Sequence, residues 1–148
     1  MLINDVQQAM FEAMKARRGD EASALRLALA ALRSAAIDAR RDLSDDEAVS
    51  VLQREARKRR EAEQAYRDAG RPERADQEAL ERSVLDRFLP AALDPAELAR
   101  LVDEAVAATG ASSPRELGKV MGRVMGQVRG RADGNEVRRL ALERLGAP

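Results

Sequence analysis

Apolar residues recur at intervals of three and four along almost the whole chain of 148 residues. That spacing is typical of one buried face of an α-helix. Aromatic residues make up only 2% of the sequence, and it has none of the valine, isoleucine, tyrosine and threonine runs that strands favour. The sequence therefore predicts an all-α fold.

Glycine, proline and capping residues divide this pattern into about seven helices. We expect them over residues 3–16, 21–41, 45–69, 72–89, 95–109, 114–128 and 134–145. Ser44 and Glu47 predict a capping box at the start of the third helix. The second helix should be central in its bundle, because Leu27 and Ala31 widen its apolar surface beyond one stripe.

The same spacing predicts which side chains form the core. In the first four helices these are Val6, Met10, Ala13, Met14, Leu25, Leu29, Leu32, Ala36, Leu52, Ala56, Tyr66, Leu80, Val84, Leu85 and Phe88. In the last three they are Leu98, Leu101, Val102, Ala105, Val106, Leu117, Val120, Met121, Val124, Met125, Val128, Val137, Leu140, Ala141 and Leu145.

Pro90 and Pro95 mark the best candidate boundary, because two prolines five residues apart cannot lie inside one regular helix. We expect a four-helix N-terminal bundle over residues 1–90 and a small three-helix domain over residues 94–148. A domain of about 55 residues is close to the lower limit for independent folding. It would therefore gain from a second packing surface.

The sixth helix carries two distinct stripes. Its start is marked by Ser113, Pro114 and Glu116, which fit a capping box with proline at the first helical position. Gly118, Gly122 and Gly126 recur every four residues, about 130° round the helix from the apolar stripe. Three interior glycines cost about 2–3 kcal/mol of helix propensity relative to alanine. This cost indicates that bare backbone is needed there.

Basic side chains lie beside these glycines. Arg115, Lys119 and Arg123 share their four-residue spacing, and Arg129 and Arg131 follow in the glycine loop. The whole chain has no net charge, but residues 113–144 carry +4 and residues 94–112 carry −3. A local excess of four charges favours modest, salt-sensitive binding of a phosphate backbone.

Two interpretations of this surface stay open. The glycines Gly118, Gly122 and Gly126 could seat another helix, or the cations could contact phosphates. The candidate nucleic-acid contacts are Arg115, Lys119, Arg123, Arg129, Arg131 and Arg138. Gly130, Asp133 and Gly134 are expected to form the loop and cap before the last helix. The basic run over residues 54–60 could also bind nucleic acid, but pairs such as Glu55–Arg59 favour a solvated helix face.

The sequence contains neither histidine nor cysteine. Catalysis by Cys-His or Ser-His-Asp groups, and zinc sites built from thiolate or imidazole, are thereby excluded. We predict no catalytic residue, no metal and no cofactor. The N-terminus lacks the layout of a signal peptide, and Arg26, Arg33 and Asp38 interrupt the longest apolar stretch. We therefore expect a cytoplasmic protein without a membrane partner.

The block G-K-V-M-G-x-V-M-x-x-V-x-G-R-A-D-G-x-x-V-x-x-L, from Gly118 to Leu140, resembles the signature of the YqeY-like family. Further matching stretches are A-M-K-A-R (13–17), L-R-x-x-x-x-x-L-R (25–33), L-P-x-x-L-x-x-x-E-L (89–98) and T-G-A-S-S (109–113). The family is similar to the C-terminal tail of GatB, a subunit of the tRNA-dependent amidotransferase. The resemblance implies a four-helix part followed by a three-helix part.

It also implies a function in translation. The GatB tail helps to hold tRNA, and the family is linked to glutamine-dependent carbon–nitrogen ligase activity through GatB. The chain lacks the kinase-like domain of GatB and the Ser-Ser-Lys machinery of its partner subunit, so we expect no catalysis by the chain alone. The implied partners are tRNA and components of an aminoacyl-tRNA synthetase or amidotransferase. The alternative is a protein–protein interaction module without an RNA ligand.

Overall fold

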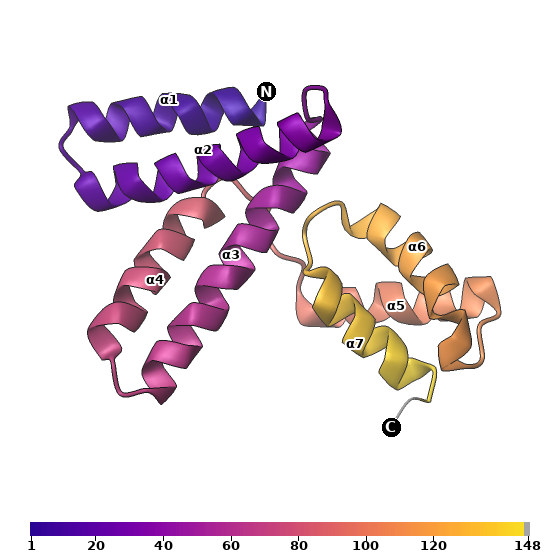
Figure 1. Cartoon of the computed structure of the whole chain (residues 1–148). Helices are drawn as coiled ribbons and strands as arrows, with labels where there is room; N and C mark the ends of the chain where they lie inside the picture. Colours follow the sequence, from indigo (N-terminus) through magenta and orange to yellow (C-terminus); the bar gives the residue numbers. More distant parts are fainter. Residues whose placement is uncertain (147–148) are drawn as a thin grey trace. The chain divides into compact units, whose positions relative to one another are not determined.

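The computed structural model describes residues 1–146, in which helices are joined by turns and loops and no strand is present. Seven α-helices and one short 3-10 helix lie in this range, so the all-α prediction is confirmed. The chain divides into two compact units, Met1–Leu89 and Pro90–Pro148. Each unit encloses its own hydrophobic core. The two are described separately below (Figure 1).

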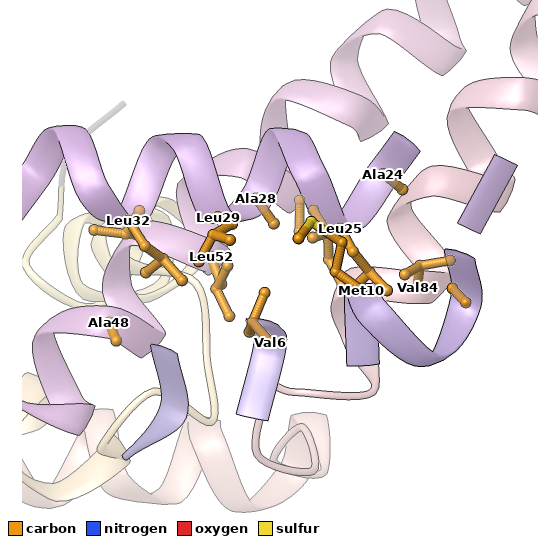
Figure 2. Packing of buried hydrophobic residues seen from close by; sticks show 14 of the residues in the cluster. Val6, Met10, Ala24, Leu25, Ala28, Leu29, Leu32, Ala48, Leu52 and Val84 are labelled. Carbon is orange, nitrogen blue, oxygen red and sulfur yellow. The ribbon is translucent and has the colours of Figure 1, made fainter. Parts of the chain in front are cut away.

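The N-terminal unit consists of two antiparallel helix pairs (Figure 1). Helix α1 (Leu2–Lys15) pairs with α2 (Gly19–Ala39), and α3 (Asp45–Asp68) pairs with α4 (Pro72–Asp86). Helix α2 contacts the other three, as its long apolar surface predicts. Figure 2 shows Leu25, Leu29 and Leu32 of α2 in the core with residues of the neighbouring helices.

Leu27, which widens the apolar surface of α2, lies outside the core of this unit. Its side chain is 51% exposed, although Leu25 and Leu29 on either side of it are buried. A step of two residues turns an α-helix by about 200°, so Leu27 lies on the side of α2 opposite the core. Its apolar surface is therefore not used for packing inside this unit. The predicted burial of Met14 and Leu80 is wrong, because both are exposed, each one turn away from a buried residue of its stripe.

The corner between α2 and α3 is held by hydrogen bonds at one carboxylate. The Glu47 carboxylate accepts hydrogen bonds from both terminal nitrogens of Arg41, at 2.8 and 2.6 Å. It also accepts one from the backbone N–H of Ser44, at 2.8 Å. The Ser44 hydroxyl accepts from the Glu47 N–H, so the predicted capping box is present. The Arg41 hydrogen bonds, followed by that of Ser44, lower the pKa of Glu47 to about 2.

The basic run over residues 54–60 pairs in part with acids of its own helix and of α4. Arg59 lies 3.4 Å from Glu55 and 3.2 Å from Glu81 of α4, and Lys58 lies 3.1 Å from Glu55. Farther along the pair of helices, Glu63 of α3 binds Arg82 of α4. The Glu55–Arg59 pair was predicted from its spacing. The contacts between α3 and α4 join residues far apart in sequence.

The C-terminal unit contains α5 (Pro95–Thr109), the 3-10 helix η1 (Pro114–Glu116), α6 (Leu117–Val128) and α7 (Gly134–Arg144). Asp94 caps α5 by accepting from the Ala96 N–H at 2.8 Å, with Pro95 in the first helical position. Each of the three α-helices contacts the other two. Their buried side chains are small or aliphatic, and they form one cluster.

We predict that Glu47 makes the N-terminal unit more stable above about pH 4.5 than in acid. Its folded pKa of about 2 lies below the ordinary value of 4.5, so its contribution is complete above 4.5 and is lost as the pH falls towards 2. Urea unfolding followed by the fluorescence of Tyr66, the one tyrosine of the chain, reports on this unit. Glu47→Gln should unfold at lower urea than the parent at pH 7.

The difference between Glu47→Gln and the parent should shrink from pH 4.5 to pH 2. Glu12→Gln, at an exposed position of α1, provides the control and should follow the parent throughout. A difference between Glu47→Gln and the parent that is the same at pH 2 and pH 7 would contradict this account of the α2–α3 corner.

Candidate nucleic-acid interface

The start of α6 is set by the η1 turn and by one glutamate. The Glu116 carboxylate accepts the backbone N–H of Ser112 at 2.7 Å, and this bond is the main cause of its lowered pKa. Ser113 makes no capping bond with its side chain, so the predicted Ser113–Glu116 capping box is wrong. The reason is that residues 114–116 form a 3-10 turn, and α6 begins only at Leu117.

One face of α6 is fixed by packing. Val120, Val124 and Val128 are completely buried against α5 and α7, and Met125 is partly buried beside them. Burying an aliphatic side chain contributes about 1.5–3 kcal/mol, so the three valines hold the helix in one rotational position. This rotation determines which residues face outward.

The glycines Gly118, Gly122 and Gly126 lie on the exposed face, which we call the glycine ridge. Apart from its chain neighbours and the backbone of its own helix, a Cβ atom added at any of the three would have no atom of the described residues within 4 Å. No helix of the C-terminal unit therefore packs on the ridge. The predicted helix-packing role stays a prediction about a partner outside this unit.

Three of the predicted phosphate contacts lie beside the glycine ridge. Arg115, Lys119 and Arg123 have exposed side chains at intervals of four residues. The ammonium group of Lys119 lies 3.7 Å from Glu116, which leaves its other side to solvent. Arg115 and Arg123 form no ion pair with any residue of the range 1–146. We call these three side chains the basic row.

The loop after α6 uses left-handed backbone. Arg129 ends the helix at a φ of 44°, and Gly130 follows at 80°. Glycine adopts such angles easily, whereas an arginine there is strained by about 1–2 kcal/mol. A cation at a helix C-terminus interacts favourably with the helix dipole and offsets part of that strain. Asp133 then caps α7 by accepting from the Asn135 N–H at 2.7 Å, as predicted.

Arg131 has a structural role that the sequence did not indicate. Its Nε atom donates to the carbonyl oxygen of Ala91 at 3.0 Å, and its own carbonyl accepts from the Leu93 N–H at 2.8 Å. These two bonds attach the segment before α5 to the loop before α7. Leu93 is partly buried in the same core. Arg131 therefore lies outside the basic row, and part of its hydrogen-bonding capacity stabilises the fold.

Arg138 reaches the surface from a different helix, α7. Two other arginines of α7 pair with acids: Arg139 lies 2.9 Å from Glu143, and Arg144 lies 2.5 Å from Asp103 of α5. Arg138 has no such partner in the described part of the chain. Of the six predicted contacts, the three residues of the basic row thus lie together on one face of η1 and α6.

The described residues include no group of three or more acidic side chains placed to hold a metal ion. Over the same range, each helix is too short or too polar to cross a membrane.

The architecture and the glycine-rich block together define a class of small helical proteins with a four-helix unit followed by a three-helix unit. A family model described as Yqey-like protein matches residues 3–145, nearly the whole chain. The chain therefore belongs to the YqeY-like family. No curated protein matches it.

We predict that Gly122→Ala stabilises the C-terminal unit. The added methyl group meets open space, and alanine is favoured over glycine in a helix interior by about 0.8–1 kcal/mol. Thermal unfolding followed by far-UV circular dichroism measures the change. Val124→Ala, two residues away and completely buried, should destabilise the unit instead. A loss of stability in Gly122→Ala would show that the ridge is packed in the free protein.

The strain at Arg129 gives a second stability prediction. Arg129→Gly should raise the free energy of unfolding by up to about 1 kcal/mol, because relief of the left-handed strain exceeds the entropy cost of glycine. Gln127→Gly, in right-handed helix two residues earlier, should lower it by about 0.5 kcal/mol. Chemical denaturation of the three proteins provides the comparison. Destabilisation of the same size in both variants would contradict the assigned conformation.

Proposed function

We propose that the protein binds structured RNA, with tRNA as the ligand class, through the basic row and the glycine ridge. The observation that carries this proposal is the exposure of Arg115 and Arg123, which have no acidic partner in the described residues. Beside them lie the three glycines of the ridge, where an added Cβ atom would meet no other helix of the described structure. Arginine forms paired hydrogen bonds to phosphate oxygens, and bare helix backbone allows a phosphate strand to approach closely.

Ion pairs within the fold already engage several arginines of the N-terminal unit. Arg59, Arg67 and Arg82 are in ion pairs between α3 and α4. Their charges are largely satisfied within the fold, whereas those of Arg115 and Arg123 are not. Arg129 and Arg138 would extend the contact from the end of α6 and from α7. Arg131 would contribute less, because its Nε atom already donates to Ala91.

Membership of the YqeY-like family supports a role beside tRNA-dependent amidation. In this proposal the chain holds tRNA, and components of an amidotransferase or an aminoacyl-tRNA synthetase carry out the chemistry. The protein would then act in the cytoplasm as an accessory factor and would not catalyse amide transfer by itself.

The direct test is titration of labelled tRNA with the protein at several salt concentrations. Contacts to three or four phosphates predict that log K falls with log salt concentration with a slope of about −2 to −3.5. The double variant Arg115→Glu with Arg123→Glu should bind at least about tenfold more weakly at low salt. It should also show a shallower salt dependence. Its melting temperature should stay close to that of the parent, since both side chains are exposed.

Arg54→Glu with Arg60→Glu is the matched control. Both residues are exposed on α3, and neither forms an ion pair within residues 1–146. This variant makes the same change in net charge on the N-terminal unit, so it should keep most of the affinity. Equal losses in the two double variants would show that binding depends on overall charge and would overturn the proposed surface. Absence of binding at low salt would overturn the RNA function itself.

A further inference from the structure

Helix α2 has a second stripe of apolar and small side chains, on the side that faces away from its core. Five side chains follow one another at steps of four and three residues: Ser23, Leu27, Ala30, Ser34 and Ile37. All five are exposed, with Leu27 at 51% and Ile37 at 73%. Spacing of this kind repeats every seven residues and is used where one helix packs along another. The N-terminal unit itself supplies no helix on this side.

A row of arginines runs along one edge of this outer stripe. Arg26 and Arg33 are seven residues apart in α2, so their Cα atoms are about 10.5 Å apart along the helix. Arg40 follows seven residues later as the C-cap of α2, in left-handed backbone. All three are exposed, and none forms an ion pair with a residue of the described range 1–146. Elsewhere in the unit many arginines are paired, including Arg41 with Glu47. The outer face of α2 thus combines unburied apolar groups with unmatched positive charge.

We propose that this outer face of α2 binds an amphipathic α-helix of a partner protein that carries carboxylates at seven-residue spacing. The small side chains of Ser23, Ala30 and Ser34 let the partner helix approach closely. Leu27 and Ile37 give it apolar surface to bury. The arginine row selects acidic residues at the flanking positions of the partner, as charges beside a helix–helix seam commonly do.

A second copy of α2 fits this face poorly. In an antiparallel pair, like flanks meet, so the two arginine rows would face each other. In a parallel pair, Arg33 would face Asp38 of the other copy. Arg26 and Arg40 would not face any acidic residue of the other α2. Arg26 and Arg33 of α2, with Arg40 at its C-cap, therefore need an acid-rich partner of different sequence.

The experiment uses the full-length protein and two designed helical peptides of about 21 residues, three seven-residue repeats, labelled for fluorescence anisotropy. Both carry leucine at the seam positions, and they differ only in having glutamate or lysine at the flanks. The glutamate peptide should bind about tenfold or more tightly than the lysine peptide at low salt. Arg26→Glu with Arg33→Glu should reverse that preference. Ile37→Asp should weaken binding of the glutamate peptide about tenfold.

Controls separate this surface from the one proposed for RNA. Arg115→Glu with Arg123→Glu should leave binding of the glutamate peptide unchanged, and all variants should keep the parental melting temperature, because the altered side chains are exposed. Binding of neither peptide, or binding that Ile37→Asp does not change, would overturn the proposal.

Two other occupants would be recognised in the same experiments. If sedimentation shows a dimer that Ile37→Asp converts to a monomer, a second copy covers the face and the proposal is wrong. If the Arg26 and Arg33 reversal abolishes tRNA binding while the glutamate peptide does not bind the parent, the arginine row contacts RNA instead. A failure of RNA binding with retained peptide binding would leave this inference standing and overturn only the proposed RNA function.

Discussion

Burial of the valine face of α6 is the interaction on which the candidate site depends. Val120, Val124 and Val128 are enclosed by α5 and α7, and this packing fixes the rotation of the helix. Gly118, Gly122 and Gly126, with the basic row beside them, are then exposed as a consequence. If α6 were rotated by a quarter of a turn about its own axis, arginine would be buried and valine exposed, at a cost of several kcal/mol. The candidate interface thus exists because the core on the other side is tightly packed.

Both units use arginine to join segments that are distant in sequence. In the N-terminal unit, arginines of α3 and α4 join the two helices through acids such as Glu63 and Glu81. In the C-terminal unit, Arg131 is hydrogen-bonded to the segment before α5, and Arg144 is paired with Asp103 of α5. The arginines without an ion-pair partner in the described residues include Arg26 and Arg33 of α2, Arg54 and Arg60 of α3, Arg123 of α6 and Arg138 of α7. A chain with no net charge can therefore still present localised positive surfaces.

Much of the fold could be predicted from the sequence, because helix periodicity and capping act over a few residues. The Ser44–Glu47 capping box and the buried stripe of α6 are examples. What could not be predicted depends on neighbours distant in sequence. The bond from Arg131 to Ala91 spans 40 residues, and Leu27 is exposed because no other helix of its unit covers that side of α2. The basic row was identified by spacing alone, but its ligand is not encoded in any local pattern.

The most direct test of the proposed interface is a titration of ¹⁵N-labelled protein with tRNA, followed by amide chemical shifts. Glycine amides appear in a separate region of the spectrum, so Gly118, Gly122 and Gly126 can be followed individually. The account predicts that these three amides, with those of Arg115 and Arg123, shift most and return when salt is raised. Shifts confined to other helices, with the three glycine amides unchanged, would contradict it.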